Sequence, residues 1–219
     1  MASTVTCAIK NYDKIKKALE QKKKAPEKVL QRTMSDIRKR APGWVAAEIV
    51  AVYGAKKAEI TGGKLGSVKV EGSDPRTAKI IYKGRMLTPT HFGMTPKAPG
   101  QNAYTLKAQI LRGQKSTLGK VKKLSKKQRA ALAKNFTRQG SKSSPKSPIM
   151  LMHTGNAQAG GTNYIPFQRV SQRRSDIKAI KSISLPQMVS SERTAPKISA
   201  ALNENLEKRL NHHMEHLMK

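Results

Sequence analysis

Small and apolar residues recur with a helical period in the first third of the chain. Between residues 26 and 41 they are spaced three and four apart, which puts them on one face of a helix. The members of this face are Val29, Leu30, Thr33, Met34, Ile37 and Ala41. Pro42 and Gly43 follow, so we expect the helix to kink or break there, before a second helical segment that ends at Gly54.

From residue 61 the period changes to two, the pattern of a strand with one buried face. Five short stretches predict strands: 62–72, 78–84, 103–113, 148–154 and 163–170. A proline-rich connector at 86–100 separates the second from the third, and its Leu87 and Phe92 are expected to fill the core. The glycine-rich stretch 155–161 lacks the lysine of a phosphate-binding P-loop, which predicts a hairpin loop instead.

The last segment, residues 196–219, predicts one more helix. Its apolar stripe consists of Ile198, Leu202, Leu206, Leu210, Met214 and Leu217. The expected fold class is therefore α+β: N-terminal helices, an antiparallel sheet of about four to five strands, and a C-terminal helix. Residues 1–25 form a lysine-rich segment expected to be helical, and 26–219 are expected to form a single α+β domain.

A long basic insertion lies between two of the predicted strands. Residues 113–146 hold eleven Lys or Arg and no acid, and we name them the arm. Loops of this length are usually functional or disordered. Its candidate contacts to nucleic acid or to an acidic partner are Lys115, Lys120, Lys122, Lys123, Lys126, Lys127, Arg129, Lys134, Arg138, Lys142 and Lys146.

The type of contact that the arm makes follows from its composition. Phe136 is its only aromatic residue, so base stacking is not expected and the contact would be electrostatic and independent of sequence. The alternative is a solvated basic loop with no partner.

The charge of the whole chain indicates the same class of partner. Lys and Arg number 44 against 13 acidic residues, a formal charge of +31. Repulsion on this scale destabilises a compact monomer unless counter-charge is supplied, which favours a polyanion or an acidic protein surface as the partner. Aromatic residues make up only 4%, so the core is expected to be aliphatic and modest in size.

Catalytic and metal-binding patterns are weak. Cys7 is the single cysteine, which excludes a disulfide framework and a thiolate cluster. His212, Glu215 and His216 have the H-x-x-E-H spacing of some zinc peptidases, but histidines in a last helical turn also complement the helix dipole. We favour the second interpretation, and expect no metal, no cofactor and no enzymatic activity.

The chain also lacks an apolar run long enough to cross a bilayer, and its first ten residues lack the pattern of a signal peptide. We therefore expect no contact with a membrane, and a protein of a reducing cytoplasm or of a particle assembled there.

The order of segments and a set of spaced residues resemble the minor tail protein Z family, the tail completion proteins of long-tailed phages and prophages. The most specific stretch is 184–189, Ser-Leu-Pro-Gln-Met-Val, which is similar to a short signature before the family's last helix. The matching positions are Tyr53, Leu87, Pro89, Phe92, Phe167, Arg169, Arg174, Ile177, Pro186, Gln187 and Met188. The chain departs from the family at Ser175-Asp176, where the family has Leu-Pro, and in the arm.

The resemblance implies a structural virion protein without catalysis, assembled in the host cytoplasm and located in the tail or neck. Its implied partners are the tail terminator, the tail tube, the head connector and completion proteins, further copies of itself in a ring, and packaged double-stranded DNA. Composition alone would favour a different class, a cellular RNA- or DNA-binding protein that does not select a sequence.

Overall fold

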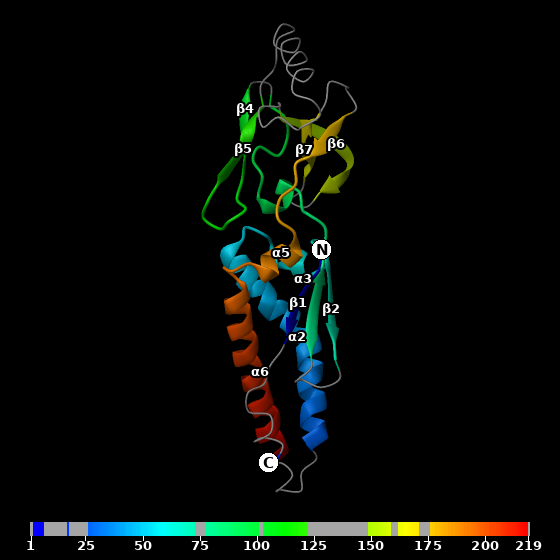
Figure 1. Cartoon of the computed structure of the whole chain (residues 1–219), viewed down its shortest axis with the longest axis vertical. Helices are drawn as coiled ribbons and strands as arrows, with labels where there is room; N and C mark the ends of the chain where they lie inside the picture. Colours follow the sequence, from blue (N-terminus) through cyan, green and yellow to red (C-terminus); the bar gives the residue numbers. More distant parts are fainter. Residues whose placement is uncertain are drawn as a thin grey trace. The chain divides into compact units, whose positions relative to one another are not determined.

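Helices and antiparallel sheets together form a mixed α and β structure, as the sequence predicts (Figure 1). The computed structural model describes residues 2–6, 17, 26–72, 78–100, 103–121, 149–158, 162–170 and 176–218. These residues contain eight strands, arranged in sheets of three, two and three strands. The prediction of one sheet with about four to five strands is not confirmed.

The chain divides into two compact units that interleave along the sequence. Unit 1 comprises Met1–Val52, Lys57–Arg85 and Ser184–Lys219, and unit 2 comprises Tyr53–Lys56 and Met86–Ile183. Both ends of the chain thus belong to unit 1, and unit 2 is formed mainly by the middle of the sequence. The predicted division into 1–25 and 26–219 stays a prediction, and it does not follow these boundaries.

Two long helices dominate unit 1. Figure 1 shows α2 (Pro26–Val52) and α6 (Ala195–Met218) side by side and running in opposite directions. Four residues of the predicted stripe on α6 are at most 1% exposed: Ile198, Leu202, Leu206 and Leu210. The predicted terminal helix and its buried face are confirmed, and each buried leucine or isoleucine stabilises the packing by about 1.5–3 kcal/mol.

Of the kink or break expected at Pro42, the break does not occur, because α2 continues through this residue to Val52. A proline inside a helix removes one backbone hydrogen bond and costs about 3 kcal/mol or more. The buried positions stay in phase on both sides of it: Ile37, Ala41, Val45 and Ile49 follow at intervals of four, each at most 1% exposed. Burial of this continuous stripe offsets the cost of the proline.

A three-stranded sheet completes unit 1, together with the short helices α3 (Lys57–Thr61) and α5 (Leu185–Ser190). Its strand order is β1–β3–β2, all antiparallel, where β2 (Ser67–Glu71) and β3 (Lys79–Lys83) are strands that the sequence predicts. β1 (Ala2–Thr6) is a correction, since the sequence predicts helix for this part of 1–25. Its backbone pairs with β3, a partner too distant in sequence for local periodicity to indicate. Lys17 is helical, and the rest of 7–25 lies outside the described residues.

Unit 2 consists mainly of strands. β4 (Tyr104–Ala108) and β5 (Ser116–Val121) form a hairpin. β6 (Ile149–Gln158), β7 (Thr162–Arg169) and β8 (Ile177–Ala179) form an antiparallel sheet. Residues 155–158 of the expected hairpin loop 155–161 belong to β6, because they continue the strand, and 159–161 lie outside the described residues.

The core of unit 2 includes a cluster of Met94, Leu106 and Ile149, with Tyr104, Leu118 and Leu151 packed against it. The connector residues Leu87 and Phe92 are buried, at 5% and 0% exposed, as the sequence predicts. Phe92 ends the short 3-10 helix η1 (Pro89–Phe92). The core is aliphatic with single aromatic rings, in keeping with the composition.

Candidate nucleic-acid interface

Charge is distributed very unevenly between the two units. Unit 2 contains 20 Lys and Arg residues and a single acid, Asp176, for a formal charge of +19. Unit 1 is larger, yet it holds the other 24 basic residues together with 12 acids. The reason is a continuous stretch of the sequence, residues 76–175, that has no Asp or Glu. Most of the excess positive charge therefore belongs to one compact unit.

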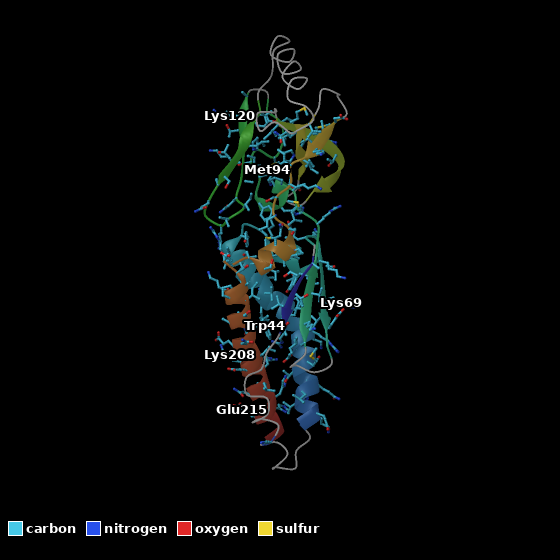
Figure 2. The ribbon with its side chains drawn as sticks, viewed as in Figure 1. Trp44, Lys69, Met94, Lys120, Lys208 and Glu215 are labelled. Carbon is cyan, nitrogen blue, oxygen red and sulfur yellow. The ribbon has the colours of Figure 1, made fainter. Side chains whose placement is uncertain are left out.

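The β4–β5 hairpin gives part of this charge a defined geometry. Leu106 and Ala108 point into the core, at 0% and 1% exposed, so the alternate residues Thr105 and Lys107 lie on the opposite face of β4. On β5, Thr117 pairs with Lys107 and Lys120 pairs with Thr105. We name the set Thr105, Lys107, Lys115, Thr117 and Lys120 the hairpin face; all but the half-buried Thr105 are exposed, and Figure 2 labels Lys120 on β5.

Backbone pairing on both sides fixes the position of Lys107. Its N–H donates to the Thr95 carbonyl at 2.9 Å, and the Thr95 N–H donates to the Lys107 carbonyl at 2.8 Å. Its other neighbour is Thr117 on β5, across a register shift between Leu106 and Lys107. The side chain of Lys107 therefore projects from the middle of three paired segments.

The start of the predicted arm is ordinary secondary structure. Lys115 immediately precedes β5 and Lys120 lies within it, so the first part of 113–146 is a strand of the hairpin and not a loop. This strand is not predicted from the sequence, because Gly119 and the lysines interrupt its apolar alternation. The remaining predicted contacts lie outside the described residues: Lys122, Lys123, Lys126, Lys127, Arg129, Lys134, Arg138, Lys142 and Lys146.

Lys107 was not among the predicted contacts, although two signals in the sequence point to it. It lies in the acid-free stretch 76–175, and it alternates with the apolar residues of a predicted strand.

Most positions that carry the family resemblance have structural placements. In unit 2, Tyr53 is 4% exposed and bridges to Leu111, Pro89 is buried in η1, and Phe167 lies on β7 beside Ala179. Arg169 and Ile177 are paired between β7 and β8. The side chain of Arg169 and the whole of Arg174 lie outside the described residues.

The stretch 184–189 of the resemblance forms the start of α5 in unit 1. Ser184 is its N-cap: the Gln187 N–H donates to the Ser184 hydroxyl at 3.4 Å, and the Ser184 N–H donates to the Gln187 side chain at 2.9 Å. Pro186 and Met188 are buried. This reciprocal arrangement is a capping box, so the spacing of Ser184 and Gln187 has a local structural cause.

A second cluster of charge, in unit 1, joins the two long helices. The Arg209 Nε–H donates to Asp36 Oδ2 at 2.7 Å, and His213 Nε2 lies 2.9 Å from the same oxygen. Arg40 Nε is 3.3 Å from Asp36 Oδ1. Burial alone would raise the pKa of Asp36, but the hydrogen bonds of Arg209 and His213 and the charges of Arg209 and Arg40 lower the pKa to about 2. The cluster stabilises the helix pair.

The H-x-x-E-H residues sit near the end of α6, where His212, Glu215 and His216 are exposed. The neighbouring His213 is the residue that contacts Asp36. Within the part of the chain that the structure describes, His, Cys, Asp and Glu side chains form no group of three or more able to hold a metal ion.

Among the described helices, none is both long and apolar enough to span a membrane. No protein-family model, curated protein or solved structure matches the chain. The hairpin face and the charge of unit 2 are the features of the molecule that support a function.

Proposed function

We propose that this protein is a noncatalytic structural component of a phage particle, acting in tail completion and head–tail joining at the head-proximal end of the tail. The observation that carries the proposal is the charge of unit 2, with 20 basic residues and one acid. A protein with this charge needs a stable counter-charge, and packaged DNA or acidic surfaces of neighbouring rings would provide it.

The family resemblance supplies the location. Its residues fall on buried or paired positions in both units, such as Tyr53, Phe92 and Met188, which is what a shared fold would require of them. In the proposed assembly, several copies pack around the tail axis and contact the tail terminator, the tail tube and the head connector or completion proteins. The basic arm and the hairpin then face the DNA or an acidic ring. The protein acts in the virion after assembly in the host cytoplasm.

Substitution of arm lysines tests the proposal. In the variant, six lysines are replaced by Gln: Lys120, Lys122, Lys123, Lys126, Lys127 and Lys134. We expect the circular dichroism and the melting temperature to match the wild type, and the yield of infectious particles to fall by an order of magnitude or more, because six phosphate or carboxylate contacts would be lost.

The matched control loses the same charge from exposed positions of unit 1. Its substitutions to Gln are at Lys28, Lys39, Lys57, Lys64, Lys79 and Lys83. We expect this control to retain the wild-type titre. An unchanged titre in the arm variant would contradict the proposed role of the arm.

The second candidate is a cellular RNA- or DNA-binding protein without sequence selection, which the charge of unit 2 also favours. It predicts tight, strongly salt-dependent binding by the free monomer and no incorporation into particles. The gene neighbourhood separates the two, since a completion protein would be encoded among tail and head-joining genes.

A further inference from the structure

We propose that the hairpin face binds the phosphate backbone of double-stranded DNA without reading its bases. This inference deepens the proposed function and rests on it only in taking packaged DNA as the natural ligand. The inference names double-stranded DNA as the ligand, whereas the proposed function allows either DNA or an acidic protein surface. It also assigns the contact to a folded hairpin, which contains the first part of the arm.

The chemistry of the hairpin face suits phosphate groups. Its members are three lysines and two threonines, and in the described chain no acid lies within unit 2 before Asp176. Lysine ammonium groups, hydroxyls and backbone N–H groups are the donors that proteins direct at phosphate oxygens. A face made of these groups neutralises phosphates and carries no group suited to distinguish one base pair from another.

The hairpin face lacks the side chains that usually hold single-stranded nucleic acid or an acidic protein. Single-stranded nucleic acid is usually held by aromatic side chains on which bases stack, and this face has none. The nearby Tyr104 packs against the core cluster, and burial raises the pKa of its phenol. Protein interfaces are depleted of lysine and use aromatic residues or arginine as anchors, so an acidic protein fits the face poorly.

The backbone of the hairpin face is preorganised for binding. Lys107 is paired to Thr95 on one side and to Thr117 on the other, and Lys120 is in register with Thr105. The backbone positions of both lysines are therefore fixed before any ligand arrives. Binding then orders only the lysine side chains, which lowers its entropic cost relative to a contact made by a flexible segment.

The test is a comparison of the full-length wild type with the triple variant Lys107→Gln, Lys115→Gln, Lys120→Gln. The control, Lys64→Gln, Lys79→Gln, Lys83→Gln, removes the same charge from exposed positions of unit 1. Binding to a random-sequence 30-base-pair duplex is followed by fluorescence anisotropy between 0.05 and 0.4 M salt. The same titrations use a 30-nucleotide single strand and polyglutamate of matched length, and circular dichroism checks that both variants are folded.

The inference predicts a specific loss in the hairpin variant. The slope of log K against log salt falls by about 3 for the duplex, and affinity at 0.1 M salt falls on the order of a hundredfold, because each phosphate contact contributes a slope of roughly 0.9. The control keeps the wild-type slope to within about 1. Polyglutamate binds the wild type more weakly than the duplex does.

Three results would overturn the inference. These are equal losses in the hairpin and control variants, no loss in either, or a greater loss for polyglutamate or the single strand than for the duplex. Incorporation of the protein into phage particles is a separate measurement, so a hairpin that does not bind DNA and a protein that is not in the virion are distinguishable failures.

Discussion

Asp36 shows how a single carboxylate can stabilise a strongly basic chain. It is the acceptor for Arg209 and His213 on α6, and Arg40 lies one turn further along α2. The side chains of Asp36, Arg209 and His213 are only 15%, 26% and 14% exposed, so water screens these interactions weakly. Removal of the carboxylate would leave two partly buried basic groups without their partner.

We predict that Asp36→Asn lowers the free energy of unfolding by roughly 1.5–3 kcal/mol near neutral pH, the range for hydrogen bonds to charged groups. Because the folded-state pKa of about 2 lies below the ordinary value of 3.8, the unfolded chain takes up the proton first as the pH falls. The stabilisation is therefore complete above about pH 5 and is lost progressively between about pH 5 and pH 2.

Urea unfolding of the wild type and of Asp36→Asn, at pH 6.5 and at pH 3, measures this difference in the free energy of unfolding. A matched control is Glu204→Gln, which removes an exposed carboxylate paired to Lys208 on the same helix and leaves stability nearly unchanged. A difference between Asp36→Asn and wild type that is as large at pH 3 as at pH 6.5 would rule out this account.

At the scale of elements, the hydrophobic period of a segment predicts whether that segment forms a helix or a strand. The five predicted strand stretches and the terminal helix all contain the expected element. β2 and β3 show the alternation of less and more exposed residues that predicts a strand, and α6 has the buried stripe that predicts a helix. Three strands lie outside the predicted stretches, namely β1, β5 and β8. Their backbones pair with β3, β4 and β7, and these pairings are tertiary contacts that the local sequence pattern does not indicate. Of the kink or break expected at Pro42, the break is wrong, because burial of the helix face outweighs the local cost of the proline.

Gly54 illustrates an element boundary with a tertiary cause. The sequence predicts Gly54 as a helix stop, but a Cβ at this position would lie 1.9 Å from the backbone oxygen of Gln109. The Gly54 N–H also donates to the Ile110 carbonyl at 3.0 Å. The glycine is therefore needed for the close approach of two backbones within unit 2.

We predict opposite effects for two alanine substitutions. Gly54→Ala forces the backbones apart and lowers the free energy of unfolding by about 1–3 kcal/mol. Gly43→Ala, in the interior of α2 with no atom within 4 Å of the added Cβ, raises it by roughly 0.5–1 kcal/mol. Thermal melting of the two variants measures the effects, and a Gly54→Ala protein as stable as Gly43→Ala would contradict the structure at this junction.

At the scale of the whole molecule, the proposed function rests on the unequal charge of the two units. The sequence alone gives the total charge and the acid-free stretch 76–175, but the assignment of that charge to one compact unit requires the fold. The hairpin face likewise requires the pairing of β4 with β5, because Lys107 and Lys120 are neighbours only through that register.

The central claim is that this protein is a structural part of a phage particle. Quantitative mass spectrometry of gradient-purified particles, from the strain that encodes it, tests the claim most directly. The account predicts a low, fixed number of copies per particle, close to the ring counts of the head–tail joining proteins. Absence of the protein from particles, with its recovery on cellular nucleic acid, would contradict the claim and favour the cellular nucleic-acid-binding protein.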